Sequence, residues 1–208
     1  MYDKSRYPLT VGILLFDEVE VLDFCGPFEV FSVTCKDEEK LFEVITVAEN
    51  RTITARNGLR VKPTHTLDSA PEFDIFLTPG GLGTRKEIHN TALVEWIRRR
   101  AERSDLVLSV CTGALLLAKA GLLTDLKATT HRAGIDLLRE LSPSTEILQG
   151  ERFVDNGKFV LSAGISAGID MSLYIVSRLL GTDIALQTAR YMEYEWEPGR
   201  DGKGNIHY

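Results

Sequence analysis

Cys111 stands where a reactive thiol is readily presented. It ends the apolar run Leu106-Val107-Leu108-Ser109-Val110 and precedes the small residues Thr112-Gly113-Ala114. A buried strand that turns sharply into a helix behind small residues is the geometry of a nucleophile elbow. The unpaired N–H groups and the dipole at the helix start favour a thiolate and lower its pKa. A buried cysteine acting as a small hydrophobe is the alternative, and the local sequence supports both about equally.

Asp23 is a second candidate because it is an acid among apolar neighbours, in Val21-Leu22-Asp23-Phe24-Cys25. Burial would raise its pKa and could keep it protonated near neutrality. A protonated carboxyl beside a thiolate can donate a hydrogen bond or a proton. Gly26-Pro27 suits the first turn of a helix, however, so Asp23 could instead cap that helix. The local sequence taken alone favours the cap.

A glycine-rich loop, Pro79-Gly80-Gly81-Leu82-Gly83, follows another apolar run. Gly80 and Gly81 would let backbone N–H groups point at a ligand, as in an oxyanion hole, and the alternative is a flexible connection. The loop is not a phosphate-binding P-loop, because the Lys-Ser/Thr ending is absent. No Cys/His spacing is typical of a zinc site, so we expect neither a metal nor a cofactor.

Two further segments carry polar groups. His131 follows Ala128-Thr129-Thr130 and is either an orienting or proton-donating residue near the thiol or a structural histidine. Ser166 lies in the run from Gly164 to Asp170 and is expected to cap a helix whose first turn contains Asp170. The small residues of that run would also allow the backbone to approach the site closely.

Composition bounds the class of protein. The 208 residues are 44% hydrophobic and 26% charged, with a formal net charge of −6, which is typical of a soluble globular protein and not of a nucleic-acid surface. The cluster Arg98-Arg99-Arg100 is interpreted as a solvated helix face. We expect a single domain over residues 1–208, with a core at about 9–195 and a polar, mobile C-terminal tail.

From the pattern of apolar residues we expect no membrane span and no signal peptide. A disulfide framework is not expected, because the sequence has only three cysteines, an odd number: Cys25, Cys35 and Cys111. We expect reduced thiols and a cytoplasmic location, with Cys25 and Cys35 in the core on a helix.

Strand and helix patterns alternate along the chain. Strands are predicted at 10–16, 42–47, 73–78 and 106–110, short extended segments at 53–67, a hairpin at 153–161 with Asn156-Gly157 as a type I′ turn, and helices at 22–35, around 93–97, and at 112–120, 133–141, 167–180 and 184–194. This order predicts an α/β fold, a mostly parallel central sheet with helices on both faces, similar to a flavodoxin-like sandwich. Ligands then bind beyond the carboxyl ends of the strands.

Taken together, the segments resemble the ThiJ/PfpI superfamily, whose fold is similar to that of class I glutamine amidotransferases. The resemblance runs from Val11 to about Glu193 through Leu22-Asp23, Pro79-Gly80-Gly81, Ser109-Val110-Cys111-Thr112-Gly113, Ala128-Thr129-Thr130-His131 and the run from Gly164 to Asp170. Within it the pattern is similar to isonitrile hydratase and to sensor domains of AraC-type regulators. Thr112 stands where protease- and glyoxalase-like branches carry His, which disfavours peptidase activity.

The resemblance implies roles for the residues. Cys111 would attack the isonitrile carbon, Asp23 would protonate that carbon and help water enter, and the product would be an N-substituted formamide. Thr112, Gly80, Gly81, His131 and Ser166 are the expected substrate-binding residues. Arg132 departs from the family pattern, which has an aromatic residue there, and this puts the pocket lining in question. The resemblance also implies a homodimer that acts on a small molecule.

Two other functions stay open. A thiol sensor or ligand-binding protein without turnover would use Cys111 as an oxidisable group. Direct control of DNA is disfavoured, because the chain to Tyr208 leaves too few residues after the fold for a helix-turn-helix region. A glyoxalase or deglycase is the third possibility, and the absence of His after Cys111 argues against it.

Overall fold

The computed structural model describes residues 7–198 and contains one large sheet, three small ribbons and seven α-helices within that range. The strands of the large sheet are β1 (Leu9–Leu14), β4 (Phe42–Ala48), β7 (His65–Thr66), β8 (Ile75–Thr78), β9 (Leu106–Val110), β12 (Phe153–Asp155) and β13 (Phe159–Ser162). The ribbons pair β2 (Cys35–Lys36) with β3 (Glu39–Lys40), β5 (Ile53–Thr54) with β6 (Arg60–Val61), and β10 (Lys127–Ala128) with β11 (Glu146–Ile147). The α-helices are α1 (Val21–Val33), α2 (Thr84–Glu87), α3 (Thr91–Arg103), α4 (Gly113–Lys119), α5 (Ile135–Leu141), α6 (Ala167–Leu180) and α7 (Thr182–Tyr191), and two 3₁₀ turns are η2 (Arg56–Gly58) and η3 (Arg132–Gly134).

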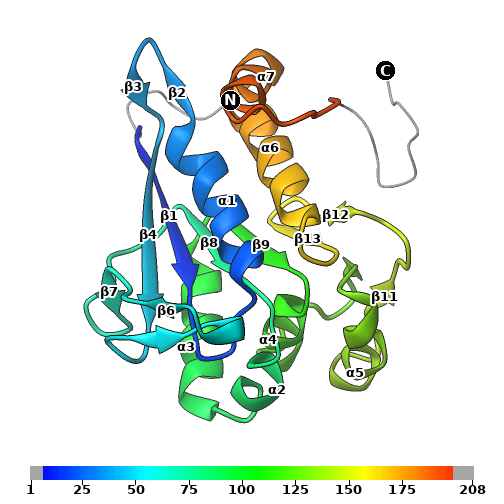
Figure 1. Cartoon of the computed structure of the whole chain (residues 1–208). Helices are drawn as coiled ribbons and strands as arrows, with labels where there is room; N and C mark the ends of the chain where they lie inside the picture. Colours follow the sequence, from blue (N-terminus) through cyan, green and yellow to red (C-terminus); the bar gives the residue numbers. More distant parts are fainter. Residues whose placement is uncertain (1–6, 199–208) are drawn as a thin grey trace.

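The large sheet has the strand order β12-β13-β9-β8-β1-β4-β7 (Figure 1). Every neighbouring pair is parallel except β12 and β13, which form an antiparallel hairpin at one edge. The predicted mostly parallel α/β sheet is therefore confirmed. Because β1, β8, β9 and β13 are parallel and adjacent, the segments that follow their carboxyl ends meet at one end of the sheet.

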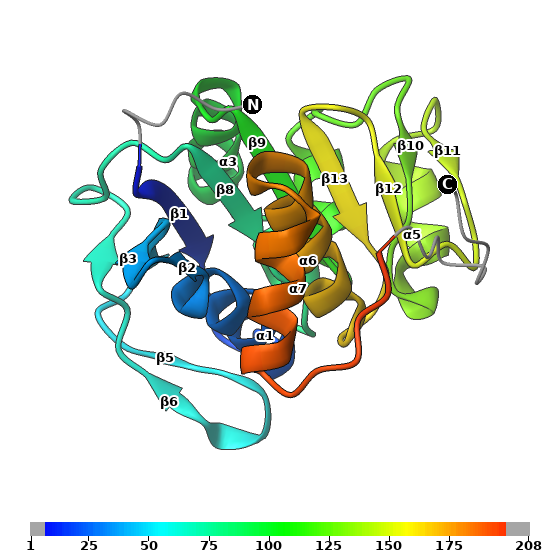
Figure 2. The same cartoon turned by 90° about the horizontal axis from the view of Figure 1, so that it is seen from above.

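Helices cover both faces of the sheet, as predicted. Figure 2 shows α1, α6 and α7 on one face and α3 on the other. Helix α4 packs against α3 and against β8 and β9, while α5 lies beyond α4 near the β10–β11 ribbon. The central strands β8 and β9 are buried along their whole length, as continuous apolar strands between two helical layers should be.

Helix α3 illustrates how sequence pattern becomes packing. The Asn90 side chain accepts a hydrogen bond from Leu93 N (3.2 Å) and caps the helix, and Trp96 lies on its buried face. The Trp96 ring meets those of Phe73 and Phe76 at centroid distances of 6.3 Å and 5.7 Å. Such aromatic edge contacts add about 0.5–1.5 kcal/mol each beyond the area they bury.

The basic cluster on α3 is solvated only in part. Arg98 and Arg99 pair with acidic neighbours on the exposed helix face, as predicted. Arg100 is different: its side chain is only 13% exposed, and its guanidinium lies over the rings of Phe73 and Trp96. Its long stem and planar head make this packing favourable, so the interpretation as a solvated residue is wrong for Arg100.

Three local predictions are corrected. The first helix ends at Val33, so Cys35 lies in β2 and is partly buried rather than on a helix. The last helix spans Thr182–Tyr191 instead of 184–194. Asn156 and Gly157 do not form a type I′ turn, because only Gly157 has a positive φ (81°). The Asn156 side chain instead exchanges two hydrogen bonds with the Lys127 backbone in β10.

No helix within residues 7–198 is long and apolar enough to cross a membrane. In the same range, no group of three or more His, Cys, Asp or Glu side chains could hold a metal ion. Most of the predicted C-terminal tail lies outside the described residues.

Candidate functional site

Cys111 occupies a sharp turn between β9 and α4, as the sequence predicted. Its φ is 57°, in the left-handed region that a non-glycine residue adopts only at a cost of about 1–3 kcal/mol. Its N–H donates to the carbonyls of Ser162 (3.2 Å) and Ala163 (3.0 Å), and its carbonyl accepts from Thr130 Oγ1 (2.7 Å). Gly113 is required next, since a Cβ there would lie 2.0 Å from the carbonyl oxygen of Thr78. The surrounding backbone therefore enforces the strained conformation of the cysteine.

Asp23 lies in the first turn of α1 and is fully buried, with 0% exposure. Its Oδ2 accepts a hydrogen bond from Gly80 N (3.0 Å). The carboxyl does not cap the helix: the N-cap position belongs to Glu20, and no side chain makes a capping bond there. The interpretation as a cap is therefore wrong. Oδ1 is buried without a well-formed hydrogen bond among the described residues, which leaves it open to a proton or a reactant.

The carboxyl and the thiol perturb each other. Burial raises the pKa of Asp23 to about 7, although hydrogen bonds from the Cys111 thiol and the Gly80 N–H lower it in part. Burial and the nearby Asp23 charge raise the pKa of Cys111 to about 12, against a smaller lowering by the N–H groups of Thr112 and Ile165. The predicted lowering of the thiol pKa by the helix start is thus outweighed, because Cys111 is almost buried, with the residue only 6% exposed.

The glycine loop does not form the expected oxyanion hole. Gly80 N donates to Asp23, and Gly81 N donates to Thr112 Oγ1 (3.0 Å), so protein acceptors occupy both groups. Gly80 is needed for another reason: a Cβ there would lie 2.5 Å from Thr112 N and 2.8 Å from Asp23 Oδ2. The loop therefore brings Asp23 and the elbow together instead of presenting free donors.

The Thr112 hydroxyl is also engaged with the glycine loop. It donates to the Gly81 carbonyl (3.1 Å), accepts from Gly81 N, and lies 3.2 Å from Thr84 Oγ1. A hydroxyl has one proton and two lone pairs, and Gly81 takes the proton and one of these lone pairs. Thr84, a buried residue of α2 that sequence reasoning missed, closes this network through a bond to the Gly81 carbonyl (2.8 Å).

Ser166 ends the next turn, residues 163–166, and His131 packs against that turn; neither side chain hydrogen-bonds to the thiol. His131 Nδ1 accepts a hydrogen bond from Ala133 N (3.2 Å), which supports the interpretation as a structural histidine. The His131 ring packs so closely on Gly164 that a Cβ there would lie 2.4 Å from it. Ser166 is at the N-cap position of α6 as predicted, but its side chain makes no capping bond. Instead its Oγ accepts from Arg152 Nη2 (3.2 Å).

Ile165 is the residue of this turn that the sequence did not single out. Its N–H contributes, with that of Thr112, to lowering the pKa of Cys111, and its φ is 55°. A backbone group carries no signature in its own side chain. The only available signal was the small residue Gly164 beside it, which allows the turn to pack closely against the His131 ring.

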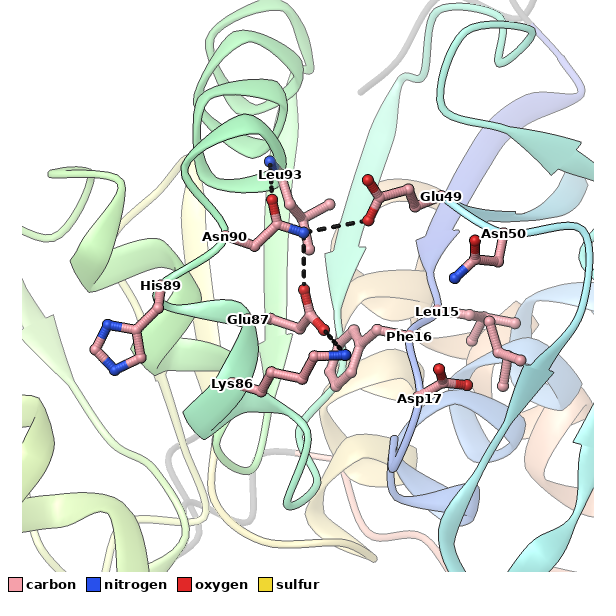
Figure 3. A pocket seen from close by; sticks show the side chains of 11 residues that line it. Leu15, Phe16, Asp17, Glu49, Asn50, Lys86, Glu87, His89, Asn90 and Leu93 are labelled. Carbon is pink, nitrogen blue, oxygen red and sulfur yellow. Dashed lines mark hydrogen bonds and ion pairs between the residues drawn. The ribbon is translucent and has the colours of Figure 1, made fainter.

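A cavity of about 350 Å³ lies elsewhere on the molecule (Figure 3). None of the residues that line it belongs to the cluster around Cys111. Two of its three carboxylates accept hydrogen bonds from a neighbouring amide: Asn90 Nδ2 donates to Glu49 (3.2 Å) and to Glu87 (3.1 Å), as the dashed lines in Figure 3 show. This cavity is therefore separate from the Cys111 site, which lies at the carboxyl ends of β8, β9 and β13.

The arrangement suits proton transfer coupled to attack by sulfur. The pair consists of the Cys111 thiol and the Asp23 carboxyl, a buried acid whose pKa of about 7 makes it change protonation near neutrality. A pKa near the working pH is what a group that both takes and gives a proton requires. Two backbone N–H groups face the sulfur and would stabilise negative charge on it.

Comparisons with known proteins agree with this fold. The chain is 36% identical over 193 residues to isonitrile hydratase from Pseudomonas putida, covering 93% of this chain and 82% of that protein. It is 28% identical to the HTH-type transcriptional regulator CdhR from Pseudomonas aeruginosa, and there it spans only 52% of the regulator's length.

A solved structure and a family model each match most of the chain. The crystal structure of a ThiJ/PfpI family protein from Pseudomonas syringae superposes with a TM-score of 0.82 at 26% identity, covering 95% of this chain and 83% of that one. The model of the DJ-1/PfpI family matches residues 9–178, which include the elbow, Asp23 and the glycine loop. The chain therefore belongs to the DJ-1/PfpI family.

Proposed function

We propose that this protein hydrates an isonitrile to an N-substituted formamide, with Cys111 as nucleophile and Asp23 as acid and base. The observation that carries the proposal is the buried Asp23 carboxyl beside the Cys111 thiol, with a pKa raised to about 7. Such an acid can deliver a proton to carbon near neutral pH. The 36% identity to an isonitrile hydratase supports the choice of substrate class.

In the first step the Asp23 carboxylate takes the thiol proton while sulfur bonds to the terminal carbon of R–N≡C. The carboxylic acid so formed gives that proton to the same carbon, and the intermediate is the thioimidate R–N=CH–S–Cys111. The N–H groups of Thr112 and Ile165 stabilise the charge on sulfur during the attack. No net proton enters or leaves the pair in this step.

In the second step water adds to the thioimidate carbon. Asp23 takes one proton from the water and passes it to the nitrogen, giving R–NH–CH(OH)–S–Cys111. The C–S bond then breaks, the hydroxyl proton returns to sulfur through Asp23, and R–NH–CHO leaves. The same carboxyl thus serves as base and acid in turn, which its pKa near 7 permits.

The test is formamide production from cyclohexyl isonitrile, followed by mass spectrometry. We expect turnover by the native chain, loss to the uncatalysed background in Cys111→Ala, and a fall in kcat of about 10²- to 10⁴-fold in Asp23→Asn. Cys35→Ala is the matched control, because Cys35 is a partly buried cysteine on β2 outside the site. Turnover that survives in Cys111→Ala would refute the mechanism, and no formamide from any isonitrile tested would refute the function.

Ligand binding without turnover is the second candidate, supported by the similarity to the regulator CdhR. It predicts that an isonitrile raises the melting temperature of Cys111→Ala as much as that of the native chain, with no product from either. A role as a readily oxidised sensor is less well supported. Burial and the Asp23 charge raise the pKa of Cys111 to about 12, so little thiolate is present at neutral pH.

A further inference from the structure

The turn at residues 163–166 lies directly against the nucleophile elbow. Ala163 O accepts the Cys111 N–H at 3.0 Å, and Gly164 packs on the His131 ring. Ile165 has a φ of 55°, which is costly for a β-branched residue, and its side chain is not packed away, at 38% exposure. The conformation of this turn is therefore unfavourable for its own residues, and other groups must hold it.

Arg152 binds the turn at both ends. Its carbonyl accepts the Ala163 N–H (2.9 Å), and its Nη2 donates to Ser166 Oγ (3.2 Å). The Arg152 Nε pairs with Asp170 Oδ2 on α6, in the first turn after Ser166. The guanidinium is thus fixed between the turn and the helix that follows it.

Tyr194 completes the cluster from a distant part of the chain. It lies after α7, in the segment that runs back toward the β12–β13 hairpin in Figure 2. Its hydroxyl donates to Asp170 Oδ1 (2.9 Å), so the two carboxylate oxygens are held by Tyr194 and Arg152. The Asp170 side chain is only 16% exposed, and its contacts are correspondingly little screened by water.

We propose that Arg152, Asp170 and Tyr194 are positioning residues that hold the 163–166 turn, and with it the Ile165 N–H, against the sulfur of Cys111. The cluster touches neither the thiol nor Asp23, and it acts through Ser166 and Ala163. The proposal rests on Cys111 being the nucleophile of the proposed function. Loosening the turn removes a donor that favours the thiolate, so the thiol becomes less reactive at a given pH.

The chain offers a matched control of the same chemistry. Asp155 on β12 accepts from the Tyr174 hydroxyl (2.6 Å) and pairs with Arg178 Nη1 (3.0 Å). This second cluster of Arg, Asp and Tyr also joins the hairpin to α6, but its hydrogen bonds and ion pair do not involve the 163–166 turn. Removing the Tyr174 hydroxyl therefore tests the general cost of losing such a bond without loosening the turn.

The experiment measures the alkylation rate of Cys111 by iodoacetamide between pH 6.5 and 9.5, read on the Cys111 peptide by mass spectrometry. We expect Tyr194→Phe and Asp170→Asn to lower the rate at every pH by about three- to tenfold, the effect of weakening one hydrogen bond to a thiolate. The logarithm of the rate should be displaced along the pH axis without a change of slope. Tyr174→Phe should keep the native rate.

The direction of the change in alkylation rate distinguishes a positioning role of the cluster from a general loosening of the fold. A cluster that only stabilised the fold would, when weakened, expose the nearly buried sulfur and make alkylation faster. Unchanged or faster alkylation in Tyr194→Phe, or equal slowing in Tyr174→Phe, would overturn the proposal. Tyr194→Phe removes only a hydroxyl and keeps the test valid if Asp170→Asn fails to fold. Because no isonitrile is used, the result is independent of whether the protein hydrates one.

Discussion

At the scale of single residues, the site is defined by two groups whose burial works against ionisation. Both the Asp23 carboxyl and the Cys111 thiol have raised pKa values, mainly because they are taken out of water. One proton shared between them is therefore the natural state near neutral pH, and the two groups titrate as a pair. In the proposed mechanism this pairing supplies an acid and a base without a histidine next to Cys111.

The shared proton predicts the pH dependence of isonitrile hydration. Above about pH 7 the pair keeps one proton, and the Asp23 carboxylate can accept it from the thiol. Below that pH a second proton binds, the base is lost, and kcat/KM should fall about tenfold per pH unit. Rates measured from pH 5 to pH 9 check this. A rate that is flat across the range, or that rises toward low pH, would contradict the assigned role of Asp23.

At the scale of elements, the junction of β9 and α4 is held by the end of β8. A Cβ on Gly113 would lie only 2.0 Å from the carbonyl oxygen of Thr78. The start of α4 can therefore approach the end of β8 this closely only at a glycine. Three parallel strand ends, β8, β9 and β13, thereby bring the glycine loop, the elbow and the 163–166 turn together. The function proposed here depends on that close approach.

Gly113→Ala tests the junction. The added methyl group meets backbone, which cannot move aside, so we expect the free energy of unfolding to fall by about 3 kcal/mol or more. Gly121→Ala is the control, because Gly121 has a φ of 74° but nothing within 4 Å of its missing Cβ. That change should cost only about 1–2 kcal/mol, the price of the left-handed backbone. Urea denaturation measures both, and equal losses would argue against a rigid junction.

At the scale of the whole molecule, the buried acid lowers stability. The pKa of Asp23 in the folded state is about 7, above its ordinary value of 3.8, so folding disfavours the ionised form. This penalty is absent below about pH 4, grows as the pH rises, and is complete above about pH 7. Proteins commonly accept such a cost at a functional site.

Asp23→Asn should therefore stabilise the fold while it impairs turnover. At pH 8 the gain in the free energy of unfolding has an upper limit of about 4 kcal/mol, and at pH 5 it should be clearly smaller. The Asn side chain keeps an acceptor for the Gly80 N–H. Thermal unfolding at the two pH values gives the comparison. A variant that is less stable than the native chain at pH 8 would show that the carboxylate is not penalised.

Oligomeric state belongs to the same scale and stays a prediction. The resemblance implies a homodimer, and several apolar side chains of the described residues are exposed, among them Leu22 and Phe28 on α1. The similarity to the regulator CdhR extends over about half of that protein, so it bears on this domain and not on DNA binding.

The sequence by itself determined the α/β class, the mostly parallel sheet and the elbow at Cys111. These follow from local features: continuous apolar strands, alternation with helices, and small residues after the cysteine. The segment motifs also indicated that Asp23 and the glycine loop belong to one site, since parallel strands end at the same edge. The boundaries of helices were less accurate, because capping and turn contacts such as those of Asn156 come from other segments.

Only the tertiary structure decided how these groups are used. The local sequence predicted that Asp23 caps a helix and that the N–H groups of Gly80 and Gly81 are free donors. In the fold, the Asp23 carboxyl accepts from Gly80 N, and the Thr112 hydroxyl accepts from Gly81 N. The pKa of the Cys111 thiol is raised and not lowered as predicted, because burial outweighs the effect of the helix start. Ionisation depends on solvent exclusion and on contacts between residues far apart in the chain, such as Asp23 with Gly80 and Tyr194 with Asp170. Such contacts exist only after the strands and helices have packed.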